Sequence, residues 1–319
     1  MYSKIGLAMM GLVLLGGCGK QPQKEAPKTP TVKKEKTTLS GSTVTSTKSE
    51  GTVYASKKEV YKQACQAGDG RGCRDLSSLY EFGLGVKKDM KQALFYVEKG
   101  CELGYGASCN RAGNFYDYGY AGVKDKAKAA AYYMKGCELG YGTACNNIGN
   151  AYISGEGVVK NIDLAETYLN KALSLGENAY ANLGFLYRVR GDDTKAIEYY
   201  TKGCQLKDKT ACGNLAYVYK EHQEYTKSYN SYLKACHLTD GSACHSASML
   251  LFKKKLTVPE MNKTMFRLDS NSCELKHAVG CSDVAYDYRK GVGVEVNPTK
   301  AKYYDKKACE LGYTSSCNR

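Results

Sequence analysis

Fourteen of the 15 cysteines in this 319-residue chain form seven pairs whose members are always eight positions apart. When Ala172 and Tyr180 are aligned as an eighth pair without cysteine, successive pairs recur every 32 to 37 residues. Self-similarity at this period predicts a solenoid of stacked helical hairpins. The pairs are Cys65 and Cys73, Cys101 and Cys109, Cys137 and Cys145, Cys204 and Cys212, Cys236 and Cys244, Cys273 and Cys281, and Cys309 and Cys317.

The residues between the cysteine pairs predict two helices in each repeat. In Cys109–Tyr116 and Cys145–Tyr152, apolar residues recur four positions apart, on one helical face. A glycine-rich loop such as 83–89 follows, and then a second helix such as 90–103. We therefore expect an all-α fold: a right-handed α/α superhelical solenoid of helix-turn-helix repeats stapled by disulfides, with a half repeat and seven full repeats over residues 53–319.

Small residues recur at one position of every first helix, where they would let two helices approach closely. This position holds Ser77, Gly113, Gly149, Gly184, Ala216, Ser248 and Ala285. Most second helices carry an alanine followed three residues later by a tyrosine, as at Ala129 and Tyr132. We expect these tyrosines to fill the core with their hydroxyl groups at its rim.

Each cysteine pair is expected to form a disulfide between the end of one second helix and the start of the next first helix. Closing a loop of about nine residues contributes on the order of 2.5 kcal/mol in the chain-entropy model. The junction at Ala172 and Tyr180 lacks this bridge and is predicted to be the weakest. So many disulfides indicate an oxidising compartment. Structural zinc sites use ligands about two to four residues apart, so we expect no metal site, and no cofactor is expected either.

Residues 1–17 have the features of a signal peptide. Lys4 supplies a positive charge, and residues 5–15 form an apolar run too short to span a bilayer as a stable helix. The run ends in Leu15-Gly-Gly-Cys18, which resembles the lipobox of bacterial lipoproteins and implies a lipid anchor on Cys18. Residues 18–52 are predicted to be a flexible tether. We expect an exported outer-membrane lipoprotein; the alternative is an ordinary secretory signal and a secreted protein.

Short motifs in the repeats resemble those of a known family. Tyr-x-x-Gly-x-Gly-Val occurs at 80–86 and 152–158, Lys-Ala-x-x-Tyr-Tyr at 128–133 and Lys-Gly-Cys-Glu-Leu-Gly-Tyr at 99–105. They are similar to Sel-like repeats (SLR), cousins of tetratricopeptide repeats, and with the cysteine spacing they resemble the Helicobacter cysteine-rich protein family. The resemblance covers residues 53–319. Because that family is catalogued as β-lactamases, it implies binding or weak hydrolysis of β-lactams, with peptidoglycan fragments as related ligands.

Catalytic motifs give this implied activity little support. A serine β-lactamase needs Ser-x-x-Lys with two partner motifs, but the chain has only Ser231 to Lys234, where other repeats place a core tyrosine. The four histidines show no metalloenzyme spacing. His237 and His245 each follow a cysteine and would face one another in a site, or else lie on the surface at a turn. No catalytic residue is assigned from the family.

The first helices offer a ladder of polar and aromatic residues for a ligand. Early repeats supply carboxamides, which donate to and accept from a peptide backbone at once. Later repeats supply aromatic and cationic side chains, among them Phe185, His245, Met249, Phe252, Tyr286 and Arg289. The candidate peptide-binding residues are Asn110, Asn114, Asn146, Asn150, Arg188, Tyr217 and Lys220. The alternative is that Asn110 and Asn146 only bond neighbouring repeats.

An extended peptide or protein segment on the concave face is therefore the expected partner. The cationic residues of the later repeats would receive its carboxylate terminus. The formal net charge of +14 is spread along the chain, so nucleic acid is not an expected partner.

Overall fold

The computed structural model describes residues 47–318, which contain fifteen α-helices, one 3-10 helix and no strand. The signal peptide, Cys18 and most of the tether lie outside the described residues. The elements are α1 (Thr47–Gln66), α2 (Gly70–Phe82), α3 (Met90–Glu102), α4 (Gly106–Tyr118), α5 (Lys126–Glu138), α6 (Gly142–Ser154), α7 (Ile162–Ser174), α8 (Tyr180–Val189), α9 (Asp193–Gln205), α10 (Lys209–Glu221), α11 (Tyr225–His237), α12 (Gly241–Phe252), α13 (Met261–Glu274), α14 (Ala278–Lys290), α15 (Pro298–Glu310) and η1 (Thr314–Ser316).

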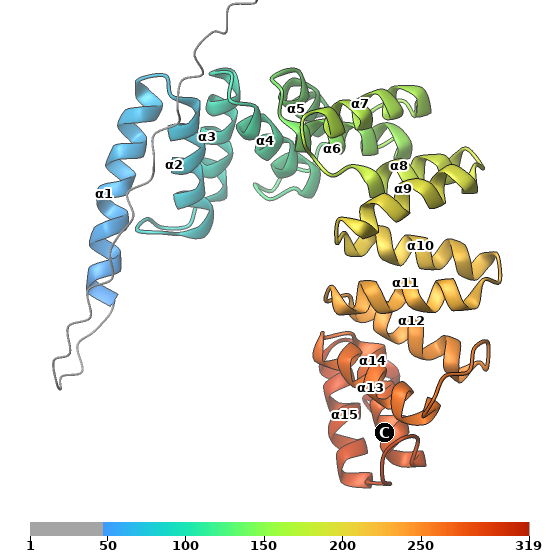
Figure 1. The fold of residues 1–319 in the computed structure, drawn as a ribbon. Coiled ribbons are helices and arrows are strands. Elements are labelled where there is room, and N and C mark those ends of the chain that lie inside the picture. The colour runs from blue at the N-terminus through green and yellow to red at the C-terminus, as the bar shows by residue number, and fades with distance from the viewer. Residues whose placement is uncertain (1–46, 319) are drawn as a thin grey trace, which may run out of the picture. The chain divides into compact units, whose positions relative to one another are not determined.

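Consecutive helices pack as seven hairpins, α2/α3 to α14/α15, each of which stacks on the next (Figure 1). Most first helices of neighbouring hairpins also contact one another directly, as α2 does with α4 and α12 with α14. They form one continuous surface, which we call the first-helix face. The predicted all-α solenoid is therefore confirmed. Among the helices of residues 47–318, none combines the length and the apolar character that crossing a membrane requires.

Local sequence explains where these helices begin and end. Most N-termini are capped by a side-chain oxygen, as where Asp89 accepts from the backbone N–H groups of Lys91 and Gln92. Four first helices end at a glycine with φ between 71° and 78°, a left-handed conformation that glycine adopts without strain. Three of these ends are Gly-x-Gly loops of the sequence motif, whereas the loop after α4 has two residues between Gly119 and Gly122. The first helices α8, α10 and α12 end instead at Arg190, His222 and Lys253.

All seven predicted disulfides form, with Cα–Cα distances from 4.4 to 4.9 Å. The first bridge begins on α1 and the others on a second helix; six end on the next first helix, and the last ends just after η1. The bridges are Cys65 to Cys73, Cys101 to Cys109, Cys137 to Cys145, Cys204 to Cys212, Cys236 to Cys244, Cys273 to Cys281 and Cys309 to Cys317.

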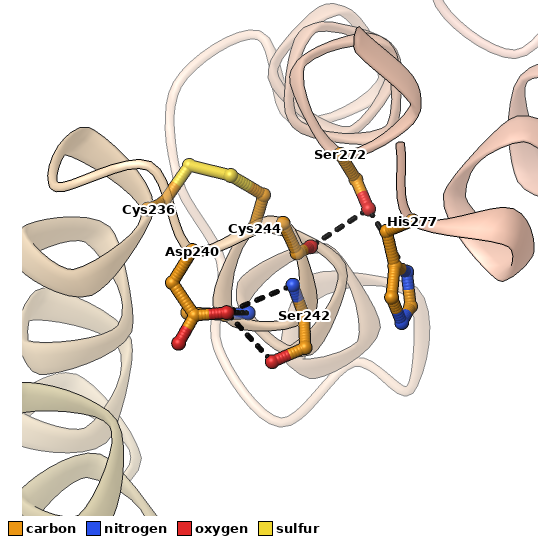
Figure 2. The surroundings of a disulfide bond; sticks show 8 residues. Cys236, Asp240, Ser242, Cys244, Ser272 and His277 are labelled. Carbon is orange, nitrogen blue, oxygen red and sulfur yellow. Dashed lines mark hydrogen bonds between the residues drawn. A yellow bond between two sulfur atoms is a disulfide. The ribbon is translucent and has the colours of Figure 1, made fainter. Parts of the chain in front are cut away.

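The bridged junctions combine a disulfide with the start of a helix. Figure 2 shows the junction of Cys236 and Cys244, where Asp240 accepts from the N–H groups of Ser242 and Ala243 and so caps α12. In the same way, Cys73 follows the cap of α2 at Asp69, and Cys212 follows the cap of α10 at Asp208. Seven disulfides indicate that the protein folds in an oxidising, exported environment.

The junction between α7 and α8 differs in register from the expected one. The Tyr141 N–H donates to the carbonyl of Gly136, the residue before Cys137, and the Glu177 N–H donates to Ala172 in the same way. Leu173, not Ala172, therefore occupies the cysteine position, and the turn to Tyr180 is one residue shorter than at the bridged junctions. The two helices also pack less extensively than any two α-helices that a disulfide links.

The core of a hairpin is a fit between the small position of the first helix and a larger residue of the second. A Cβ atom added to Gly113 would lie 2.4 Å from the Tyr133 ring, so only glycine leaves room for that ring. Gly184 makes the same room for Tyr200. The tyrosines that were expected to fill the core stack on first-helix tyrosines and are half-buried, as where Tyr132 lies on Tyr116 with ring centroids 5.7 Å apart.

Candidate binding sites on the first-helix face

The asparagine rows divide into bonded and accessible members. Asn110 Oδ1 accepts from Asn147 Nδ2 at 2.8 Å, and Asn146 Oδ1 accepts from Asn182 Nδ2 at 2.9 Å. Each bond joins successive first helices. Asn110 and Asn146 therefore bond neighbouring repeats, which was the alternative to their binding a peptide. We call each of these hydrogen bonds between successive first helices a rung; the rungs hold the first-helix face together.

Asn114 and Asn150 lie together in a hollow of about 100 Å³ between α4 and α6. The Asn114 carboxamide accepts from the Tyr133 hydroxyl at 2.8 Å, whereas Asn150 is exposed. Lys126 closes one side of the hollow through ion pairs with Asp117 at 2.5 Å and Glu156 at 2.7 Å. Of the four asparagines, Asn150 is the one best placed for a ligand.

Arg188, Tyr217 and Lys220 come together on α8 and α10. The Arg188 guanidinium and the Lys220 ammonium group lie 5.2 and 4.8 Å from the centroid of the Tyr217 ring. Arg188 also pairs with Glu221 at 2.5 Å and approaches Asp193 at 3.5 Å. A carboxylate terminus of a peptide would therefore have to displace these internal partners, so Lys220 is the more available cation.

The histidine and serine candidates are placed differently from a catalytic arrangement. His245 faces His277, with ring centroids 5.4 Å apart, and its Nδ1 lies 2.7 Å from Asp283 Oδ2, while His237 is exposed. The His245–Asp283 contact joins α12 to α14 at the rung position of the asparagine pairs. Ser231 is buried and Lys234 is exposed, so these two residues do not present a nucleophile with its base to solvent.

A pocket of about 270 Å³ opens between α12 and α14, with α13 as its floor. We call it the α12–α14 pocket; it is lined by Ser248, Met249, Phe252, Met265, Asp269, Ser282, Asp283, Tyr286, Asp287 and Tyr313. Phe252 and Tyr286 form an exposed rim, with 51% and 42% of their surface accessible. Asp269 and Asp287 are buried at its base, with 4% and 2% accessible.

The two buried carboxylates are incompletely satisfied. Asp269 Oδ2 accepts from Ser248 Oγ at 2.9 Å, but Asp269 Oδ1 and Asp287 Oδ2 have no hydrogen-bond partner within residues 47–318. Burial and the neighbouring charges of Asp283 and Asp287 raise the pKa of Asp269 to about 8. Burial and Asp283 raise the pKa of Asp287 to about 7. Buried acceptors without a hydrogen-bond partner are rare and point to an absent ligand or proton.

Sequence reasoning missed this pocket although a signal was present in the repeat register. Asp269 lies four residues before Cys273, where other second helices have Val97, Tyr133, Tyr200 and Tyr232. Asp287 lies six residues after Cys281, where other first helices have Leu79, Phe115, Val218 and Leu250. Both carboxylates thus occupy apolar core positions, and the missing ring of a tyrosine at 269 leaves the space that the pocket fills.

Three groups near the base of the pocket have the composition of a metal site. One ligand atom each from His245, Asp269 and Asp283 lies within 4.8 Å of the others. Metal–ligand bonds of about 2.0–2.2 Å would require these atoms to close in on one another. The contact between His245 and Asp283 already uses two of the three groups.

A family model described as Sel1 repeat matches residues 70–105, 106–141, 142–177, 178–208 and 278–313. Together these segments cover more than half of the chain and coincide with helix hairpins, such as α2/α3 for the first. A comparison with curated proteins found no match.

Solved structures with the same fold include two repeat proteins. A protective antigen of uropathogenic Escherichia coli with an SLR fold is 21% identical, with a TM-score of 0.60, over 82% of this chain and 58% of its own. This chain thus spans less than two thirds of that protein. A Sel1 repeat protein from Oxalobacter formigenes is 21% identical, with a TM-score of 0.58, over 83% of this chain and 72% of its own. Cysteine-rich protein B of Helicobacter pylori is 34% identical over 40% of this chain and 91% of its own, with a TM-score of 0.34.

Proposed function

Because this chain belongs to the Sel1 repeat family, whose solenoids generally bind protein partners, we propose that it binds an extended segment of a partner protein along its first-helix face. The observation that carries the proposal is a set of exposed aromatic residues on four successive first helices, three at the same repeat position and Phe252 about one turn further along its helix. Phe185, Tyr217, Phe252 and Tyr286 project from α8, α10, α12 and α14. Aromatic anchors of this kind contribute strongly to protein interfaces.

Hollows between the first helices support the same surface. They occur between α4 and α6, between α10 and α12, and between α12 and α14, with volumes of about 100, 300 and 270 Å³. Since each hollow is lined by residues of two successive hairpins, a segment lying across the helices would place successive side chains in successive hollows. An extended peptide fits this arrangement better than a compact ligand held in one pocket.

We further propose that the protein works outside the cytoplasm, held by a lipid on Cys18. The seven disulfides support export, and the Leu15-Gly-Gly-Cys18 motif supports the anchor. In cells that secrete the protein, Cys18→Ser should abolish incorporation of a labelled fatty acid and release the protein from the membrane fraction. Labelling that persists in this variant would refute the anchor.

Selection from a random peptide library on the immobilised full chain tests the binding function. Peptides are expected to be enriched, and Tyr217→Ala should weaken their binding at least tenfold. Tyr303→Ala is the matched control, because Tyr303 is also exposed but projects from the second helix α15. Equal losses in both variants, or binding that neither changes, would show that the first-helix face is not the binding surface.

A further inference from the structure

The α12–α14 pocket gathers buried carboxyl groups, and residues 47–318 provide no cation to balance them when they ionise. The charged groups that act on Asp269 and Asp287 are other carboxylates, chiefly Asp283, and within the described part of the chain Ser248 supplies the hydrogen bond to Asp269. The next hairpin shows a carboxylate whose charge is balanced. Asp305, at the position of α15 equivalent to Asp269, accepts from the Arg289 guanidinium at 3.0 and 3.2 Å. In the α12/α13 hairpin, no cationic side chain of residues 47–318 stands at the position that corresponds to Arg289.

The rim of the pocket adds a second property. Phe252 and Tyr286 meet edge to face, with ring centroids 6.3 Å apart and planes at 87°. Aromatic rings beside carboxylates favour an organic cation, which gains attraction from the ring faces as well as from the charges. A guanidinium or ammonium group on an alkyl stem would bury its charge at the base and its methylene groups against Met249 and Met265.

Size and geometry favour an organic cation over a metal ion. A water molecule occupies about 30 Å³ in the liquid, so a cavity of about 270 Å³ has room for the end of a side chain. His245 and Asp283 are bonded to each other as a rung between α12 and α14, and metal binding would break that rung. Asp287, whose Oδ2 has no hydrogen-bond partner among residues 47–318, lies outside the three-residue metal group.

We propose that the α12–α14 pocket binds the cationic end of an arginine or lysine side chain, with Asp269 and Asp287 as its counter-charges and Phe252 and Tyr286 as its walls. In the cell that side chain belongs to the partner segment, so the inference rests on the proposed function in this respect. It gives that function a specificity: one position of the bound segment is basic.

Titration of the full chain with blocked arginine (N-acetyl-arginine amide) tests the pocket without any partner. Saturable binding is expected by calorimetry or NMR, with shifts confined to α12, α13 and α14. Blocked citrulline is the matched probe, since it keeps the shape and removes the charge, and it should bind at least tenfold more weakly. Equal binding of the two probes would overturn the proposal.

Variants locate the site. Asp269→Asn with Asp287→Asn should weaken blocked-arginine binding at least tenfold, and Phe252→Ala, at the exposed rim, should weaken it severalfold. Asp117→Asn removes the same kind of charge from the hollow between α4 and α6 and should leave binding unchanged. Binding that survives the double variant would overturn the proposal, as would preferential uptake of Zn²⁺ or Mn²⁺ that His245→Gln abolishes and blocked arginine does not displace.

Proton linkage supplies an independent readout. The cation requires ionised carboxylates, so the affinity for blocked arginine should rise between about pH 6 and 9, as Asp287 and then Asp269 lose their protons. Asp283, His245, His277 and Tyr286 also face this region, and the double Asn variant separates their titration from that of the two buried carboxylates. An affinity that does not change with pH would contradict the proposal.

Failure here is distinguishable from failure of the proposed function. Library peptides that bind through Tyr217 but show no preference for arginine or lysine, together with no blocked-arginine binding, would leave the first-helix face as a binding surface and remove the cation pocket. Blocked-arginine binding without any library peptide would do the reverse.

Discussion

The α4/α5 and α12/α13 hairpins are built on the same frame but differ at two facing core positions. In α4/α5 the Tyr133 ring packs against Gly113 and its hydroxyl reaches Asn114. In α12/α13 the equivalent residues are Asp269 and Ser248, which bond to each other and leave a pocket of about 270 Å³ beside them. Disulfides flank both hairpins. A shared frame thus allows a few core positions to become a binding site.

The largest expected effect comes from placing an aspartate, as found at position 269, at the equivalent position of the α4/α5 hairpin. Tyr133→Asp should lower the free energy of unfolding by about 3–5 kcal/mol, because it removes a buried ring and places a carboxylate against apolar neighbours. Urea unfolding followed by circular dichroism measures this change. Tyr118→Asp, at an exposed position of the same hairpin, should cost less than about 0.5 kcal/mol. A similar cost for both would break the comparison.

The shared frame predicts equal costs in the two regions. Replacing Cys137 and Cys145, or Cys273 and Cys281, with alanine should lower the free energy of unfolding by about 2.5 kcal/mol in each case, because both bridges close loops of the same length. Denaturant unfolding of the two double variants measures the costs side by side. Costs that differ by more than about 1 kcal/mol would show that the frame does not contribute equally.

The reverse exchange should stabilise the C-terminal hairpin. Asp269→Leu replaces a buried, partly unsatisfied carboxylate with an apolar residue and should raise the free energy of unfolding by about 1–3 kcal/mol. It should also abolish blocked-arginine binding. Urea unfolding gives the first result and calorimetry the second. Loss of stability would mean that Asp269 has a structural role in its own hairpin.

The two raised pKa values predict a difference in pH dependence. The folded-state pKa of Asp269, about 8, lies above its ordinary value of 3.8, so the folded protein holds a proton that the unfolded chain loses. The stability that depends on this proton is fully present below about pH 4 and is lost as the pH rises toward 8. The proton on Asp287 acts in the same way up to about pH 7. The midpoint temperature of thermal unfolding should therefore fall more steeply with rising pH in the wild type than in the double variant Asp269→Asn with Asp287→Asn. Parallel curves would refute the raised pKa values.

Periodic features of the sequence predicted the fold well. The cysteine spacing and the helix patterns indicated the hairpins and all seven disulfides, because each repeat reports the same local structure independently. The register at Leu173 was missed because a turn shortened by one residue leaves no mark when the cysteines are absent. That this junction is the first to open in hydrogen exchange stays a prediction, which its weaker packing supports.

The candidate site was only partly predictable. The positions of Phe252, Tyr286 and His245 on the first-helix face followed from helical spacing. The roles of Asn110 and Asn146 as rungs did not, because a carboxamide one turn from the surface can face either a ligand or its neighbour. Asp269 and Asp287 were missed because a carboxylate in a helix ordinarily indicates a solvated face. Their burial becomes visible only when each is compared with the residue at the same position of the other repeats.

The eight-residue spacing of every disulfide also bears on how the protein is made. Eight cysteines alone allow on the order of a hundred pairings, and a secreted chain with fourteen would ordinarily need extensive reshuffling. Here each cysteine's correct partner is its nearest neighbour along the chain, as for Cys65 with Cys73 and Cys204 with Cys212, and the turn between the two helices brings them together. Bridges can therefore close one after another as the chain emerges during export, so oxidative maturation should depend little on a disulfide isomerase.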